Sequence, residues 1–204
     1  MKEFVYKHKW IIYPIFIVII LCAVLYFSIS PLKRNLFYMN YKYLSSFSFA
    51  YAEDTSNDSP YADYTICYYC DDEYSFDIEN AAKVYNNCIE CVSQKEYKDI
   101  ASHKLSVYFK AKHSGNEFRI IGLNDKEIIT SFNVSPNEII KHFGNIKRMQ
   151  FKDIKKNSYC YDIQYYSDIN ELEYIYFDNM PEQDIIDKLN KRFPDCVIEY
   201  NKES

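Results

Sequence analysis

Glycine is scarce in this chain, with three residues among 204. A phosphate-binding loop needs several glycines, because its backbone amides must approach the phosphate closely. The chain has no GxGxxG pattern, no P-loop, no HExxH and no GxSxG, and its four histidines are scattered. We therefore expect a non-enzymatic protein without a resident cofactor. An enzyme whose site is assembled from residues far apart in the sequence stays open.

Most of the chain lacks a net positive charge. Six of the 24 Lys and Arg residues lie in the first 52 positions, where the only acidic residue is Glu3. That segment is therefore +5, and because the whole chain is −5, residues 53–204 carry −10. A domain this acidic repels phosphate backbones. We expect no nucleic-acid partner.

A long apolar run lies near the N-terminus. Positions 10–29 are twenty residues without a charge, and a helix of that length covers about 30 Å, the thickness of a hydrocarbon core. Trp10 and Tyr13 at one end, and Tyr26 and Phe27 at the other, suit the two membrane interfaces. We predict a short N-terminal segment at 1–9 and a transmembrane helix at 10–30, through which the protein associates with a membrane.

Two features bear on how this helix is placed. The run is longer than the 7–15 residues usual in a signal peptide, and Pro31, Lys33 and Arg34 follow it instead of a cleavage site. We expect an uncleaved signal-anchor. Basic residues flank the run evenly, so the positive-inside rule gives no orientation. Because the preceding segment is so short, we predict a cytoplasmic N-terminus and a C-terminal domain outside the cytoplasm.

Residues 31–62 separate this helix from the rest of the chain. Seven aromatic residues fall within positions 35–51. Such a stretch either lies along the membrane surface, or is a stalk or the first strand of the domain; both interpretations stay open. The polar, acidic sequence from position 53 to 62 is typical of a linker. We predict an aromatic juxtamembrane stretch and then a linker.

Residues 63–204 are long enough for one domain. Capping patterns predict helices beginning at Asp77, Ser135 and Asn179. Alternating or apolar runs predict strands at 105–111, 118–123, 127–133, 146–153, 159–166, 171–177 and 196–200. The order suggests two α-β-β-β units and a closing α-β. Few connections look long enough for parallel crossovers, so we predict an α+β domain of antiparallel sheet with about three helices on one face.

Cysteine spacing is the strongest motif. Cys67 and Cys70 form one CxxC pair, and Cys88 and Cys91 form another seventeen residues later. Two such pairs can close a structural zinc site. Outside the cytoplasm the same four residues, with Cys160 and Cys196, would instead form disulfides. We favour disulfides, with zinc as the alternative cofactor and unlinked buried thiols as the third possibility.

Tyrosines supply the candidate interaction surface. Alternation places Tyr161 and Tyr165 on one face of their predicted strand, and Tyr174 and Tyr176 on one face of the next. Tyrosine offers large contact area at low entropy cost, which favours recognition. The sequence therefore predicts a single-pass membrane protein that presents an acidic extracytoplasmic domain to an unknown protein partner. The alternative is a cytoplasm-facing anchored domain with a four-cysteine zinc site.

Overall fold

The structure is a computed structural model that describes residues 9–54, 64–94 and 105–202. Within these residues the α-helices are α2 (Lys9–Ser28), α3 (Pro31–Asn40), α4 (Ile78–Val92), α6 (Pro136–Phe143) and α7 (Gln183–Arg192). The 3-10 helices are η1 (Tyr41–Tyr43), η3 (Tyr159–Tyr161) and η4 (Ile163–Tyr166). The strands are β1 (Ser48–Asp54), β2 (Tyr64–Cys70), β3 (Leu105–Ala111), β4 (Glu117–Ile121), β5 (Lys126–Thr130), β6 (Ile146–Phe151), β7 (Tyr174–Phe177) and β8 (Val197–Tyr200).

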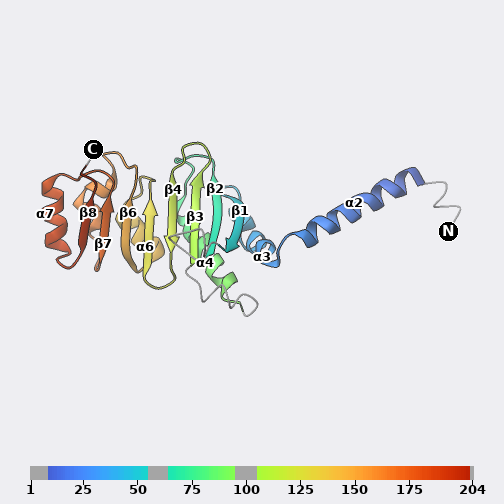
Figure 1. Cartoon of the computed structure of the whole chain (residues 1–204), viewed down its shortest axis with the longest axis horizontal. Helices are drawn as coiled ribbons and strands as arrows, with labels where there is room; N and C mark the ends of the chain where they lie inside the picture. The colour runs from blue at the N-terminus through green and yellow to red at the C-terminus, as the bar shows by residue number, and fades with distance from the viewer. Residues whose placement is uncertain (1–8, 55–63, 95–104, 203–204) are drawn as a thin grey trace.

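The eight strands form one sheet in which spatial order equals chain order, from β1 to β8. Figure 1 shows this succession, with β1 beside α3 at one end and β8 beside α7 at the other. β1 pairs antiparallel with β2, and β3, β4 and β5 form an antiparallel meander. The other pairs, β2 with β3 and β5 through β8, are parallel. The α+β class with an N-terminal apolar helix is confirmed, but the expectation of an antiparallel sheet is wrong because the sheet is mixed.

The parallel crossovers fit into shorter connections than we expected. The eight residues of α6 rise about 12 Å, which returns the chain along most of a strand of five or six residues. Helix α7 does the same between β7 and β8. The first predicted unit, α4 followed by β3, β4 and β5, is present. The second is not, because only β6 and β7 follow α6 as strands before α7.

Two of the three predicted helix starts are confirmed. Asp77 Oδ1 accepts hydrogen bonds from the Glu79 and Asn80 amides at 3.0 and 3.1 Å. Ser135 Oγ accepts from the Glu138 amide at 3.2 Å, and α6 ends at Gly144, whose φ of +73° suits a residue without a side chain. The third start is wrong by three residues. Glu182 is the residue that precedes helix α7. The side-chain amide of Asn179 does not cap this helix and donates to the Ile154 carbonyl at 3.0 Å.

The strand predicted at 159–166 is wrong. These residues form η3 and η4. Asp162, between them, accepts the Gln164 amide at 3.1 Å through its side chain, a local turn that competes with strand pairing. The Tyr166 hydroxyl donates to the Cys160 carbonyl at 2.7 Å and closes the segment on itself. This short segment of alternating residues therefore forms two 3-10 turns and does not pair as a strand in the sheet.

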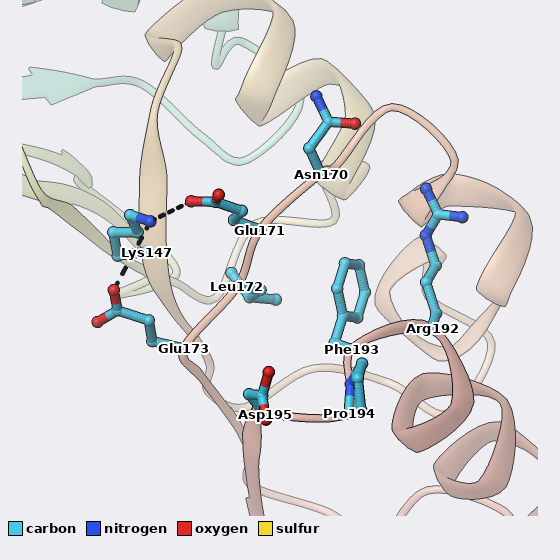
Figure 2. A pocket seen from close by; sticks show the side chains of 9 residues that line it. All are labelled: Lys147, Asn170, Glu171, Leu172, Glu173, Arg192, Phe193, Pro194 and Asp195. Carbon is cyan, nitrogen blue, oxygen red and sulfur yellow. Dashed lines mark hydrogen bonds and ion pairs between the residues drawn. The ribbon is translucent and has the colours of Figure 1, made fainter.

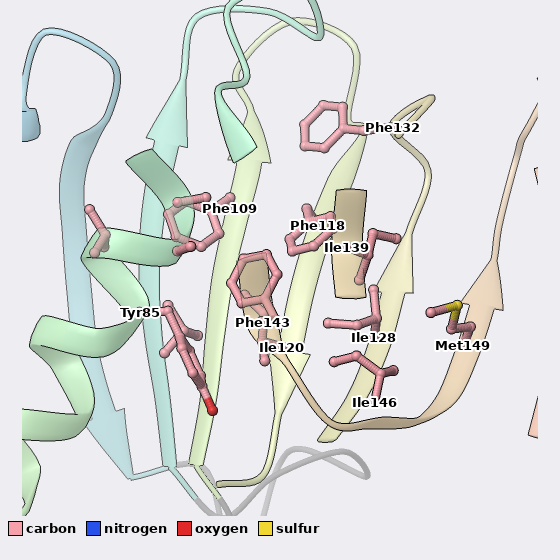
Figure 3. Packing of buried hydrophobic residues seen from close by; sticks show 14 of the residues in the cluster. Tyr85, Phe109, Phe118, Ile120, Ile128, Phe132, Ile139, Phe143, Ile146 and Met149 are labelled. Atoms are coloured by element: carbon pink, nitrogen blue, oxygen red, sulfur yellow. The ribbon is translucent and has the colours of Figure 1, made fainter. Parts of the chain in front are cut away.

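The core lies between one face of the sheet and the helices. Figure 3 shows Phe109, Phe118 and Ile128 from the strands meeting Tyr85 of α4 and Phe143 of α6. At the edge of this core, the rings of Phe76 and Phe132 stack at 4.5 Å with an interplanar angle of 16°. Burial of the apolar side chains of this core stabilises the packing of the helices on the sheet.

The domain begins earlier than predicted. Leu32 and Leu36 of α3 are buried in the core, Phe47 joins them, and β1 pairs with β2. Residues 31–54 are therefore part of the domain, and the boundary at 63 is wrong. The aromatic stretch supplies a helix and the first strand, which was one of the two interpretations. Most of the predicted linker, residues 55–62, lies outside the described residues, as do residues 1–8.

Helix α2 stands apart from this core. It is long and apolar enough to cross a membrane, and no residue of Trp10–Ser28 is buried against the rest of the chain. Two residues, Ile29 and Ser30, separate it from α3. Arg34 Nη1 reaches back across this junction and donates to the Tyr26 carbonyl at 2.9 Å.

Candidate interaction surface

The sheet has a second face, opposite the helices, that we call the open face. The paired strands carry one row of side chains across it: Tyr51, Cys67, Tyr108, Arg119, Ile129, Gln150, Tyr176 and Glu199. None of these eight residues belongs to the cluster packed between the sheet and the helices, although Cys67, Tyr108 and Ile129 are themselves buried, at 1%, 8% and 0% exposed. The open face is therefore a separate surface that spans the full width of the sheet.

Aromatic rings and guanidinium groups stack on this surface. The Arg119 guanidinium lies 4.2 Å from the centre of the Tyr108 ring, and the Arg148 guanidinium lies 4.3 Å from that of Tyr174. Each arginine also faces a glutamate at 3.8 Å, Glu117 and Glu127 respectively. Tyrosine and arginine are the residues most enriched where proteins contact one another. The pairing leaves the face close to neutral, although the domain as a whole is acidic.

The phenols of the open face are hydrogen-bond donors at neutral pH. Burial, followed by the hydrogen bond to Glu199, raises the pKa of Tyr174 to about 12. Burial and contact with the Cys67 thiol raise the pKa of Tyr51 to about 12. The pKa of Tyr108 is also raised, mainly by burial and then by Glu117. These phenols therefore stay protonated at neutral pH and do not act as bases, and the Tyr174 hydroxyl already donates to Glu199 at 2.8 Å.

The structure separates the four predicted interaction tyrosines. Tyr174 and Tyr176 share the open face, as their spacing indicates. Tyr161 lies on the other side of the sheet, where its ring stacks on Phe177 at 5.4 Å. Tyr165 packs edge-on against Tyr159 at 4.8 Å in the adjoining turns. The four residues therefore do not form one surface, and the recognition role of Tyr174 and Tyr176 stays a prediction.

The four-cysteine zinc site does not form. Residues three apart in a strand lie on opposite faces, so Cys67 is on the open face and Cys70 is in the core. Helix α4 runs back along the sheet between parallel β2 and β3, which places Cys91 toward the start of β2 and away from Cys70 at its end. Among the described residues no three His, Cys, Asp or Glu side chains are placed to share a metal ion.

The expected disulfides are also missing, because all seven cysteines are free in the structure. Burial raises the pKa of Cys67, Cys70, Cys91 and Cys196 to about 11, and that of Cys88 and Cys160 to about 12. These six side chains are therefore neutral thiols at physiological pH, whereas metal binding and nucleophilic attack both require the thiolate. The third possibility, unlinked buried cysteines, is the one that the structure contains.

A cleft of about 480 Å³ lies at the carboxyl ends of β2, β5 and β6; we call it the edge cleft. In sheets with parallel strands, this edge is where ligands usually bind. Glu73, Asn133, Asp153 and Asn157 are among the residues that line it. Asp153 has a φ of +50°, which is uncommon for a residue with a side chain, and its amide is held by Asp178 at 2.8 Å. The edge cleft has the size and polarity to hold a small polar ligand.

A smaller hollow of about 290 Å³ lies near the amino ends of β6, β7 and β8. Figure 2 shows Lys147 between Glu171 and Glu173, at 2.6 and 3.6 Å, with Phe193 separating them from Arg192. The hydrogen bond to Glu171 raises the pKa of Lys147. The Arg192 guanidinium donates to three backbone carbonyls, those of Tyr166, Ser167 and Ile169. Lys147 and Arg192 are therefore already paired with groups of the domain itself.

Sequence reasoning missed Tyr51, Tyr69 and Arg119 as surface residues. The signal was present in part, because alternation over 105–111 already placed Tyr108 on the face opposite the core. Extending that register to its neighbours required the pairing of β1 with β2 and of β3 with β4. The position of Tyr51 also depends on a register shift between Phe49 and Tyr51, which no pattern in the sequence predicts.

Comparison with known proteins identifies no relative, because no protein-family model, no curated protein and no solved structure matches this chain.

Proposed function

We propose that this chain is a single-pass membrane protein whose uncleaved helix α2 anchors an acidic, non-enzymatic domain outside the cytoplasm, where the domain binds a protein partner. The observation that carries the proposal is the contrast between α2 and the rest of the chain. Helices α3, α4, α6 and α7 all contribute residues to the core or lie with a buried face on the domain, whereas no residue of Trp10–Ser28 is buried. An apolar helix of that length needs an apolar environment.

The open face supports the binding part of the proposal. A surface that carries the half-buried Tyr51, Tyr174 and Tyr176, with the Arg148 guanidinium stacked on Tyr174, suits another protein better than a small molecule, because these residues are spread across the sheet from β1 to β7.

A second candidate is the same anchored domain facing the cytoplasm. The six free thiols of the domain favour it, because cysteines remain reduced in that compartment. Zinc is not part of this second candidate, since the four cysteines do not converge.

One labelling experiment separates these candidates. In a Cys22→Ala background the remaining thiols are buried and should be silent toward a membrane-impermeant maleimide. Tyr74 is 88% exposed, so Tyr74→Cys adds one reactive thiol on the domain. Labelling of intact cells supports the outside location, and labelling only after lysis supports the cytoplasmic one. Retention of the full-length mass in a carbonate-washed membrane pellet is expected; a soluble, shortened chain would mean that α2 is a cleaved signal.

A photocrosslinking experiment tests the open face. Benzoylphenylalanine at Tyr176 should give an adduct with a defined protein in cells that express the full chain. The matched position is Asn190, an exposed residue of α7 on the other side of the domain. Equal adducts at both positions, or none at Tyr176, would contradict recognition through the open face.

A further inference from the structure

Helix α3 presents two different faces. Leu32, Leu36 and Asn40 are buried against the domain. The opposite stripe begins at Arg34 and continues with Phe37 and Tyr38 and then with Tyr41, the first residue of η1; these three rings are 44%, 62% and 63% exposed. The spacing of three, four and seven residues after Arg34 places all four side chains along one side of a helix. We call these residues the α3 stripe.

Large exposed aromatics are unusual on a helix that is already packed on one side. Each of the three rings is at least 44% exposed within the described residues, and Phe37 and Tyr38 form an edge-on pair at 6.0 Å. Its direction is fixed by Arg34, whose guanidinium donates to the Tyr26 carbonyl and lies 4.1 Å from the centre of the Tyr26 ring. Arg34, at the start of the stripe, therefore contacts the last turn of α2.

Chain length restricts what lies there. Only Ile29 and Ser30 separate α2 from α3, and two residues reach about 7 Å at full extension. If α2 crosses a bilayer, α3 must begin within the headgroup layer. Tyr26 and Phe27, which are 49% and 80% exposed, lie in the last turn of α2. Together with the α3 stripe they place five exposed aromatics at one membrane interface, where tyrosine and phenylalanine partition favourably.

We propose that the α3 stripe lies in the headgroup layer of the membrane that α2 crosses, with Phe37, Tyr38 and Tyr41 as its buried groups. This inference rests on the proposed anchoring by α2. The occupant of the stripe is the lipid interface and not a protein. Lys33 and Lys42 flank the stripe and supply the positive charge that suits the phosphate groups of this layer. The domain is then held at one height and one tilt instead of swinging on a flexible tether, because α3 is packed rigidly on α4.

Tryptophan quenching by brominated phosphatidylcholine tests this proposal on the full chain in vesicles. The native chain has one tryptophan, Trp10, which reports on α2 alone. In a Trp10→Phe background, Tyr38→Trp reports on the α3 stripe, and Tyr74→Trp is the matched control because Tyr74 is an exposed tyrosine outside the stripe, in the turn that follows the carboxyl end of β2. We expect loss of fluorescence at positions 10 and 38 in proportion to the brominated fraction, and no loss at position 74.

Each other outcome has a distinct meaning. Quenching at position 10 without quenching at position 38 overturns the proposal for α3 and leaves the anchor intact. Absence of quenching at both positions overturns the anchor, and the proposal for α3 with it. Equal quenching at positions 38 and 74 would mean that the whole domain lies on the lipid, which also overturns a specific stripe. Position 38 is solvent-facing, so the substitution does not disturb folding.

Discussion

A buried polar group joins three elements of the domain. The Asn40 amide of α3 donates to the Tyr68 hydroxyl of β2 at 2.6 Å, and that hydroxyl lies 3.3 Å from Cys88 Sγ of α4. Asn87 donates to Asn40 Oδ1 at 3.2 Å. Because Tyr68 is fully buried, this hydroxyl cannot be replaced by water without rearrangement.

We predict that Tyr68→Phe lowers the free energy of unfolding by about 1–3 kcal/mol, because the Asn40 amide loses its partner inside the core. Tyr69→Phe is the matched control, since Tyr69 is the next residue of the same strand and faces the opposite side. It should change stability by less than about 0.5 kcal/mol. Urea denaturation of both variants measures the difference. Equal midpoints would mean that the hydrogen bond at Tyr68 contributes nothing net.

The raised pKa values of the buried thiols predict how the free energy of unfolding changes at alkaline pH. Their pKa values are raised from 9.0 to about 11 for Cys91 and about 12 for Cys88. A raised folded-state pKa means that the unfolded chain loses its protons first. The contribution to stability is therefore complete below about pH 9 and is lost as pH rises toward the folded-state values. Thermal melts from pH 7 to 11 should show a plateau followed by a decline. A decline that starts below pH 8 and is unchanged in Cys88→Ala would contradict this origin.

At the scale of elements, helices α4 and α7 differ in how their N-termini are capped. Asp77 accepts two backbone amides at the start of α4, whereas the side chain of Glu182 accepts none at the start of α7. We predict that Asp77→Ala lowers the free energy of unfolding by about 0.5–2 kcal/mol. Glu182→Ala, an equivalent truncation at the same kind of position, should be nearly neutral. Denaturant midpoints of the two variants check the difference, and the reverse order would contradict it.

Elements with strong local signals were predictable from the sequence. Asp77 and Ser135 mark where α4 and α6 begin, through local hydrogen bonds, and Gly144 marks where α6 ends, through its backbone preference. Both helices could therefore be predicted from these residues. Strand direction was not predictable, because parallel pairing depends on where α6 and α7 return the chain. The segment around Asp162 failed because its side-chain turn overrode an alternating pattern. The zinc and disulfide hypotheses failed at Cys67 and Cys70. Two cysteines three residues apart can approach each other in a loop, but in a strand they lie on opposite faces of the sheet.

The whole molecule divides into α2 and a domain that begins at α3. We predict that a fragment of residues 30–204 folds without detergent and has the same denaturation midpoint as the domain in the full chain, because α2 contributes no buried residue. A fragment of residues 45–204 lacks Leu32, Leu36 and Asn40 and should be strongly destabilised. Circular dichroism melts of both fragments give the comparison. If both fragments melt alike, α3 does not belong to the folding unit.

The match between strand order and chain order has a consequence for synthesis. Each strand pairs only with the strands made directly before and after it, so a chain leaving the ribosome at about 5–20 residues per second never has to wait for a distant partner. The ladder grows at a single moving edge, and the newest strand is always the one that awaits its neighbour. When synthesis ends, the unpaired edges that remain are those of β1 and β8, at opposite ends of the sheet, where they cannot zip together within one molecule.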